Sequence, residues 1–454
     1  MKRLFLFVLP LLFLTCCLGG YDAYAADVCV GASATGNGSG SDWNNQSQWS
    51  TLSFARGNMY YLADGTYGAK TLGTPVSGST YIYIKKATAS AHGTETGWVS
   101  TMGDGVATFT GGLTVSTSYW DISGVTGGGP GNWTLGHGFA FSSAVASAVT
   151  YIVITSGSEY INIRHSSFVQ TGNPTTAGTG GTAIYCNGNV SNSIFEYNYF
   201  NNLVGLPFLL RGGSGNSIQY NYTGDICGMW IYNGGHCEAL VQHSMNDVHF
   251  RWNYIGECPS TGGFVKNNSG TTSDGIRIYG NIFSNGMPIS VDGTATNWRV
   301  FNNTFIGMIG GPISMPGAFG ASNLFYNNLI YNSSMGFLPA THKYNWFSSI
   351  KSNNCSTGGN ATENIVVRYP NSCDIVTETS NPFVNSSGTA PEDFRLVLSG
   401  RHTGTDVCAL DACTGEIKYN IDAFGTTRSG WDIGAYEYAD TNDISPPRQL
   451  RIVY

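Results

Sequence analysis

The sequence is poor in charge. Only 11% of its 454 residues are Asp, Glu, Lys or Arg, and the formal net charge is −7. A mildly acidic chain with so few basic residues lacks the electrostatic footprint of a nucleic-acid-binding protein, so no nucleic-acid partner is expected. Glycine is abundant instead, with 61 residues, and this composition disfavours long helices and favours short strands joined by turns.

The chain has one long apolar run, and it lies at the N-terminus. Two basic residues precede the apolar residues 4–18, and Ala23-Tyr24-Ala25 has the small-x-small form of a cleavage site. This arrangement predicts a signal peptide over residues 1–25 and a protein that is secreted or displayed at the cell surface. The run is short for a membrane-spanning helix and no later segment could be a second one, so no membrane span is expected.

The cysteines do not have the spacing of a metal site. None of the 11 cysteines falls in a paired pattern typical of zinc ligands, so no metal role is expected for them. An exported chain can form disulfides instead. Sequence does not determine connectivity, but three pairs are close enough in the chain to be candidates: Cys408 with Cys413, Cys227 with Cys237, and Cys355 with Cys373.

A short phrase recurs through the middle of the chain, at intervals of roughly 20 to 30 residues. Its anchors are Asn198, Asn221, Asn253, Asn281, Asn303 and Asn328. The position three residues before each anchor is always apolar, being occupied by Phe195, Ile218, Phe250, Ile278, Val300 and Phe325. The position two residues after it is almost always apolar, with Phe200, Thr223, Ile255, Phe283, Phe305 and Ile330.

The repeat predicts a β-solenoid. Alternation of apolar and mixed residues within each phrase is typical of short strands whose apolar side chains face inward. Neighbouring coils would pair in parallel, and each Asn would lie at a bend between two strands. Stacked at that bend, the Asn amides would hydrogen-bond to one another along the axis.

Three further segments carry a resemblance to a known family. They are RGNMYYLADGTYG (56–68), STSYWDISGVT (116–126), and NPFVNSS to EDFRLVLSG (381–400) followed by DAFGTTRSGWDIGAYEY (422–438). With the repeat, they resemble the right-handed parallel β-helix repeat family, the pectate-lyase-like group, of the bacterial secreted type. The resemblance implies an all-β, right-handed parallel β-helix. It implies no single activity, because this scaffold carries lyases, hydrolases and adhesins.

A solenoid must close both ends, because open ends expose the core and unpaired strand edges. We expect an N-terminal cap and lead-in at residues 26–55 and the parallel β-helix at 56–340. C-terminal coils and a cap are expected at 341–440, where the Asn phrase fades, and an exposed tail at 441–454.

Ionisable residues recur in comparable strands of four successive coils, which is unusual in so uncharged a chain. Coils stack about 4.8 Å apart, so these side chains would form a strip on one face. A chain of surface ion pairs is the alternative explanation. The predicted catalytic residues are Arg211, Glu238, Lys266 and Asp292, with His236 beside Glu238. The segment GGHCEAL also resembles a His-x-Glu segment of several uncharacterised bacterial β-helix proteins, which implies no reaction.

Basic and aromatic residues share other outward columns of the middle coils. Arg forms paired hydrogen bonds with carboxylates and Tyr covers apolar sugar faces, so these columns predict binding of an acidic polysaccharide. Packing of the tyrosines beneath a long loop is the alternative. The predicted substrate-binding residues are His249, Arg251, Arg277, Arg299, Tyr199, Tyr222 and Tyr254.

Three functions stay open at this point. A polysaccharide lyase, which we favour, would use Lys266 as the base, with Arg211 or Arg277 holding a uronate carboxylate. An inverting glycoside hydrolase would use Glu238 and Asp292, two coils and therefore about 9.5 Å apart. A surface or matrix protein would bind glycan without cleaving it.

No cofactor is assigned from the sequence. The chain lacks the cluster of Asp residues at one coil that characterises the calcium-dependent lyases of this fold, although a calcium ion stays open. We expect a monomer.

Overall fold

The structure is a computed structural model. It describes residues 26–144, 149–171, 181–203, 205–224, 226, 238–256, 265–286, 289–308, 313–314, 320, 322–333, 342–348, 381–397 and 402–438. The predicted signal peptide, the predicted tail, His236 and two of the three candidate cysteine pairs lie outside these residues. Within the described part of the chain, no helix is long and apolar enough to cross a membrane.

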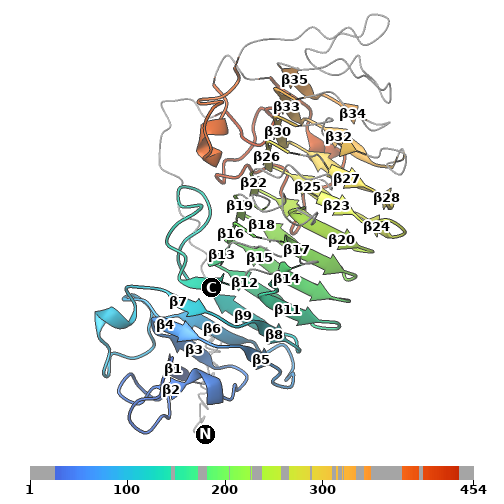
Figure 1. Cartoon of the computed structure of the whole chain (residues 1–454). Coiled ribbons are helices and arrows are strands. Elements are labelled where there is room, and N and C mark those ends of the chain that lie inside the picture. Colours follow the sequence, from blue (N-terminus) through green and yellow to red (C-terminus); the bar gives the residue numbers. More distant parts are fainter. Residues whose placement is uncertain are drawn as a thin grey trace, which may run out of the picture.

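Three long parallel sheets run along the molecule, and each strand pairs with its counterparts one coil before and one coil after (Figure 1). Sheet A has 13 strands. In spatial order they are β2 (Ser47–Gln48), β1 (Asp27–Gly31), β3 (Met59–Leu62), β6 (Ile82–Lys86), β9 (Trp120–Ser123), β12 (Ile161–Arg164), β15 (Ile194–Glu196), β18 (Ser217–Gln219), β21 (His249–Arg251), β25 (Arg277–Tyr279), β29 (Arg299–Phe301), β32 (Leu324–Tyr326) and β34 (His342–Lys343).

Sheets B and C have 11 and 9 strands. Sheet B contains β4 (Gly65–Tyr67), β7 (Ala107–Phe109), β10 (Phe139–Ser143), β13 (Ser166–Gln170), β16 (Tyr199–Asn201), β19 (Tyr222–Thr223), β22 (Tyr254–Ile255), β26 (Ile282–Ser284), β30 (Thr304–Ile306), β33 (Leu329–Tyr331) and β35 (Trp346–Ser348). Sheet C contains β5 (Lys70–Leu72), β8 (Leu113–Val115), β11 (Ile152–Thr155), β14 (Thr182–Asn187), β17 (Leu206–Arg211), β20 (Leu240–His243), β23 (Val265–Asn267), β27 (Ile289–Val291) and β31 (Ile313–Ser314).

Short elements complete the description. β24 (Thr272–Asp274) and β28 (Thr294–Thr296) form a separate parallel pair, and the 3-10 helices are η1 (Trp49–Thr51), η2 (Ser100–Met102), η5 (Pro391–Phe394) and η7 (Val407–Ala409). The repeated passage from one sheet to the next, coil after coil, makes the fold a right-handed parallel β-helix, which confirms the predicted fold class.

The predicted inward columns are confirmed residue by residue. Phe195 pairs with Ile218, which pairs with Phe250, and the register continues to Ile278, Val300 and Phe325. All six side chains are fully buried in one continuous apolar core. The interior follows from period-two alternation, because every second residue of each strand points into the coil.

The Asn residues form the predicted ladder inside the bend between sheets A and B. Each backbone N–H donates to the side-chain oxygen of the Asn one coil on, from Asn198 through to Asn345, at 2.9–3.1 Å. The residue before each Asn has positive φ, for example 58° at Tyr197 and 56° at Trp252. The ladder therefore satisfies backbone groups that a sharp, buried turn would otherwise leave unpaired.

The N-terminal residues close the first coil. Trp49 of η1 is 2% exposed and packs edge-on against Tyr67 and Phe109 of sheet B, with ring centroids 5.8 and 5.7 Å apart. β1 and β2 extend sheet A past this point. The bulky indole thus covers the end of the core, which an open solenoid would expose to water.

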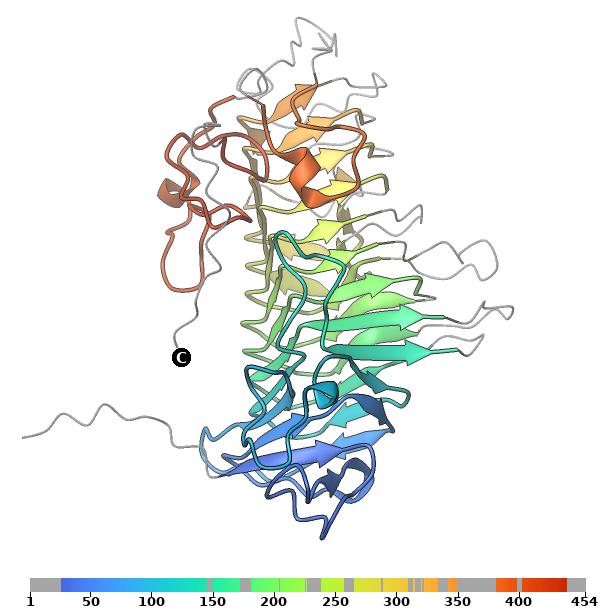
Figure 2. The same ribbon diagram turned by 90° about the vertical axis from the view of Figure 1, so that its left-hand side faces the viewer.

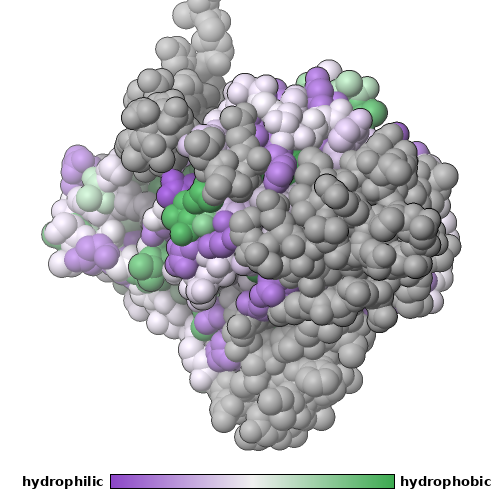
Figure 3. Space-filling view, turned by 90° about the horizontal axis from the view of Figure 1, so that it is seen from above, coloured by the Kyte–Doolittle hydropathy of each residue, from purple (hydrophilic) through white to green (hydrophobic). Residues whose placement is uncertain are grey.

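The C-terminal segments lie along the outside of the coils, whereas the sequence predicts only coils and an end cap there (Figure 2). We use the name "C-terminal cover" for residues 381–397 and 402–438. The cover reaches back to early and middle coils, where Trp252 Nε1 donates to Ile421 O and Tyr222 Oη donates to Thr389 O, both at 3.2 Å. Seen along the axis from the last coils, the described surface carries only scattered hydrophobic patches (Figure 3).

The cover is tied together by a buried guanidinium. Arg428 is 4% exposed and its head group donates to the carbonyl oxygens of Asp432, Gly434 and Ala435. Glu437 accepts from the backbone N–H groups of Ser429, Gly430 and Asp432. The sequence motif at residues 422–438 therefore has a structural role. Its buried charged side chains form hydrogen bonds that hold the backbone of the cover together.

Candidate functional site

The candidate site lies on sheet C. Two outward columns follow this sheet from coil to coil, and one of them runs from Leu209 through Val241 to Lys266 and Ser290. The other begins with Arg211, which pairs with His243. Asn268 and Asp292 directly follow the next two strands, β23 and β27.

Two carboxylates converge on Lys266. Its Nζ lies 3.4 Å from Glu238 Oε1 and 3.3 Å from Asp292 Oδ2. The two carboxylate oxygens are therefore less than about 7 Å apart, because both lie near the same nitrogen. This corrects the sequence-based separation of about 9.5 Å, which counted coils and ignored the inclination of the side chains.

Glu238, Lys266 and Asp292 differ in how far their side chains are exposed to solvent, and this difference limits the role that each can have. The Glu238 side chain is 0% exposed, whereas those of Lys266 and Asp292 are 12% and 26% exposed. A fully buried carboxylate cannot reach a sugar, so Glu238 is suited to orient Lys266 and not to act on a substrate directly. The Lys266 ammonium, held between two carboxylates, is a charged hydrogen-bond donor at the surface of the site.

A cavity of about 280 Å³ opens on this face. Its charged or titratable lining residues are Arg211, His243 and Lys266, and its lining also contains Asn268 and the apolar Leu206, Leu209 and Val241. Arg211 is exposed, and its guanidinium lies 5.4 Å from the ring centroid of Tyr185. The cavity therefore offers two cations to an anionic ligand beside an imidazole.

In the sequence, His243 belongs to the charged strip together with His236 and Glu238, but it is not among the predicted catalytic residues. Burial lowers the pKa of His243 below its usual 6.5, and the positive charges of Arg211 and Lys266 lower this pKa further. Its ring nitrogens lie 3.3 and 3.4 Å from Asn268 Nδ2. The imidazole is thus neutral at pH 7 and able to accept a proton. The strand register puts it in the outward column of Arg211.

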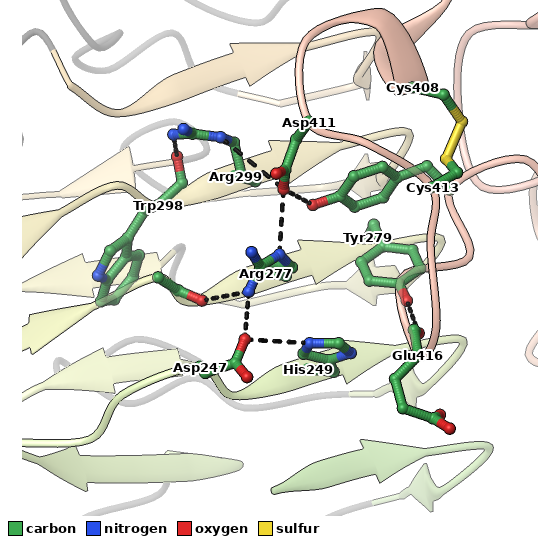
Figure 4. Close-up of polar contacts among 12 residues, drawn as sticks. Asp247, His249, Arg277, Tyr279, Trp298, Arg299, Cys408, Asp411, Cys413 and Glu416 are labelled. Atoms are coloured by element: carbon green, nitrogen blue, oxygen red, sulfur yellow. Dashed lines mark hydrogen bonds and ion pairs between the residues drawn. A yellow bond between two sulfur atoms is a disulfide. The ribbon is translucent and has the colours of Figure 1, made fainter. Parts of the chain in front are cut away.

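The predicted basic binding column is covered (Figure 4). Arg277 Nε donates to Asp411 Oδ2 at 3.0 Å, and Arg299 Nε lies 4.0 Å from the same oxygen. The disulfide Cys408–Cys413 closes the loop that carries Asp411, and it is the one candidate cysteine pair within the described residues. These carboxylate contacts occupy the guanidinium groups that a polyuronate would need.

The other two members of this column, Arg251 and His249, are buried and paired with acidic side chains. Arg251 is 3% exposed and its Nη2 lies 3.1 Å from Glu416 Oε2 of the cover, while His249 is 5% exposed and lies 3.4 Å from Asp247. The sequence-based assignment of substrate binding to His249, Arg251, Arg277 and Arg299 is therefore corrected, because acidic side chains of the cover pair with the three arginines and His249 is buried beside Asp247.

The three tyrosines pack as a column beneath the cover. Tyr222 and Tyr254 stack with ring centroids 4.6 Å apart, and Tyr254 stacks on Phe394 of η5 at 6.2 Å. Tyr199 is half-buried and stacks on His137 at 6.0 Å. This is the packing alternative of the sequence analysis, in which the tyrosines hold a long segment against the coils.

No cation site emerges from the described part of the chain, in which no three His, Cys, Asp or Glu residues gather in a way that could hold a metal ion. A calcium ion stays open, as it does from the sequence, and the described residues offer no set of ligands for it.

Comparison with known proteins gives a likeness in fold only. No family model matches the chain, and no curated protein matches it. Among solved structures, pectate lyase Pel9A is 13% identical with a TM-score of 0.48, and the alignment covers 92% of this chain and 98% of Pel9A. The Agl-KA catalytic domain is 13% identical with a TM-score of 0.29, covering 65% of this chain and 59% of that one.

The alginate lyase AlyGC, of family PL6, is also similar to this chain. Its structure is 13% identical with a TM-score of 0.32, and the alignment covers 74% of this chain and 53% of AlyGC. Likenesses at this level carry no conclusion about reaction or substrate. The parallel β-helix is established by the strand register of the chain itself.

Proposed function

We propose that the protein is an exported polysaccharide lyase that binds an acidic polysaccharide along sheet C and cleaves it by β-elimination. The observation that carries this proposal is the cavity in which two cations, Arg211 and Lys266, flank the neutral imidazole of His243. Export rests on the predicted signal peptide over residues 1–25.

The chemistry needs a base, a cation and a proton donor. Arg211 would bind the uronate carboxylate with paired hydrogen bonds, which acidifies the adjacent C–H. His243 would remove that proton, the electron pair would form a carbon–carbon double bond, and the neighbouring glycosidic C–O bond would break. The departing oxygen takes up a proton, which the Lys266 ammonium in the same cavity would donate.

The assignment differs from the sequence-based one in the choice of base. Lys266 forms ion pairs with Glu238 and Asp292, so His243 is better suited to accept a proton. Glu238 and Asp292 become positioning residues for the ammonium. Hydrolysis by these two carboxylates is less well supported, because Glu238 is fully buried.

The first test is incubation of the mature protein with a panel of acidic and neutral polysaccharides. We expect an increase in ultraviolet absorbance from unsaturated uronates with at least one acidic polymer. New reducing ends without that absorbance would contradict elimination and indicate hydrolysis. Retention on an immobilised acidic polymer without cleavage would indicate a glycan-binding protein.

The pH dependence of turnover provides a second test. Because burial and then the two cations lower the pKa of His243 below 6.5, the neutral form of the base predominates at pH 6.5, and the acidic fall in kcat/KM should lie below pH 6.5. Arg211→Gln removes one positive neighbour, so the acidic fall should move to higher pH in this variant. An acidic limb that stays in place would show that another group titrates. The measurement is kcat/KM between pH 4 and 9 for both proteins.

A further inference from the structure

A long loop joins an early coil to the C-terminal cover. Residues 124–138 connect β9 with β10 and extend along the coils towards η5 (Figures 1 and 2). Glu392 Oε1 of η5 accepts hydrogen bonds from the backbone N–H of Gly131 and from Trp133 Nε1, each at 2.8 Å. One carboxylate oxygen thus ties the tip of this loop to the cover.

A histidine lies near each end of the loop. The Nδ1 atom of His165 lies 2.6 Å from Gly127 O, and its ring stacks on Tyr197 with centroids 4.9 Å apart. His137 is 6% exposed, and its buried Nε2 has no hydrogen-bond partner among the residues that the structure describes. The loop is packed closely here, since a Cβ added at Gly128 would lie 2.2 Å from Tyr197 O.

The surroundings of both rings disfavour positive charge. Burial lowers the pKa of His137 and of His165 to about 4, and each has a further cationic neighbour, His165 for His137 and Arg164 for His165. The carbonyls of Tyr197 and Gly127 oppose this shift only partly. The nearby carboxylates of Asp121 and Glu196 lie against Arg164, at 3.8 and 3.0 Å.

The other groups packed around the rings are Tyr197 and Tyr199, which stack on them. Within the described residues, no ion pair joins either histidine to a carboxylate. Protonation of both rings would therefore add two positive charges to a buried site next to Arg164, whose guanidinium already contacts the carboxylates of Asp121 and Glu196.

We propose that His137 and His165 form an acid-sensitive latch, whose protonation opens loop 124–138 and releases the tie between this loop and the C-terminal cover. Opening would uncover the rings of Tyr197, Tyr199 and Tyr222. The latch is independent of the proposed lyase chemistry, because its histidines lie in connections between sheets A and B and neither of them lines the cavity on sheet C.

The sign of the response follows from the lowered pKa values. In the open loop each imidazole regains its usual pKa of 6.5, so the open form binds protons more tightly than the closed form. The closed form is fully retained above pH 6.5 and weakens as the pH falls towards about 4. At pH 4 each histidine should increase the open population by about 100-fold relative to pH 7.

Hydrogen–deuterium exchange of the full mature chain tests the latch. After correction for intrinsic exchange rates, amides of residues 124–138 should lose at least about 100-fold in protection between pH 7 and pH 4. Peptides from β25 to β30 should keep their protection. Equal protection of the loop at both pH values would overturn the proposal.

Single variants separate the two histidines from other acid-sensitive groups. His165→Asn, which suits the positive φ of 53° at this position, and His137→Gln should each remove about half of the response on a logarithmic scale. His402→Asn, at a histidine of the cover, should leave the response unchanged. Glu392→Gln keeps an acceptor for the loop, so this variant should retain the pH response. Loss of the response in Glu392→Gln, with retention in both histidine variants, would assign it to the carboxylate.

Discussion

Replacing Asn281 with Ala should lower the free energy of unfolding by about 3–5 kcal/mol. This side chain is fully buried in the middle of the ladder. Its oxygen accepts from the backbone N–H and the side-chain Nδ2 of Asn253, at 2.9 and 3.0 Å. Its Nδ2 donates to Phe250 O at 2.8 Å and to Tyr279 O at 3.1 Å. Truncation leaves these donors and acceptors buried without partners, and each such group costs about 1–3 kcal/mol.

The matched control is Asn187→Ala. Asn187 is exposed at the end of β14, and its side-chain oxygen accepts a bond from the hydroxyl of Tyr185. Water can replace that bond, so the change in stability should stay within about 0.5 kcal/mol. Denaturant unfolding followed by circular dichroism measures both variants. A loss below about 1 kcal/mol for Asn281→Ala would mean that the ladder is a consequence of the coil geometry and not one of its causes.

The ladder also shows why the fold was predictable from the sequence. A parallel β-helix repeats the same local environment in each coil. The apolar residue of the inward column and the Asn of the bend therefore recur in the sequence once per coil. Six Asn residues and the apolar column containing Ile278 were enough to give the register. Asn345 was missed because it follows Asn328 at a shorter interval than the other anchors.

The C-terminal cover could not be predicted in the same way. Its contacts with Arg251 and Arg277 join residues more than a hundred positions apart, and no periodicity relates the two partners. A basic column on the outside of a sheet looks identical in sequence whether it binds a polyuronate or the acidic side chains of Asp411 and Glu416. The two alternatives are distinguished only by the folded structure, in which the C-terminal cover packs against this column.

The candidate site was predictable in part. One ionisable residue per coil brought Lys266 beside Glu238 and Asp292, which coil stacking requires. The burial of Glu238 was not predictable, because it precedes β20 and its orientation depends on the turn into that strand. The lowered pKa of His243 likewise depends on burial and on two cations from neighbouring coils, which are properties of the folded chain.

Replacing His243 with Ala should lower kcat by about a hundredfold to ten-thousandfold on the acidic polymer that the wild-type protein cleaves. The loss should appear in kcat more than in KM, because Arg211 and Lys266 still bind the carboxylate. Stability should change little, since His243 is only partly buried and its side-chain contact with Asn268 is one that water can replace. Initial rates of unsaturated uronate formation measure the effect, and thermal unfolding verifies the fold.

Chemical rescue distinguishes a base from a residue that merely shapes the cavity. Deleting the imidazole enlarges a cavity of about 280 Å³, and free imidazole should enter it and restore part of the rate. The rescued rate should increase with the fraction of neutral imidazole, hence with pH, because only the neutral form accepts a proton. His402→Ala, a change on the C-terminal cover, should keep the full rate. Near-normal kcat in His243→Ala would remove His243 as the base and return that role to Lys266, whose ammonium would then have to lose its proton between Glu238 and Asp292.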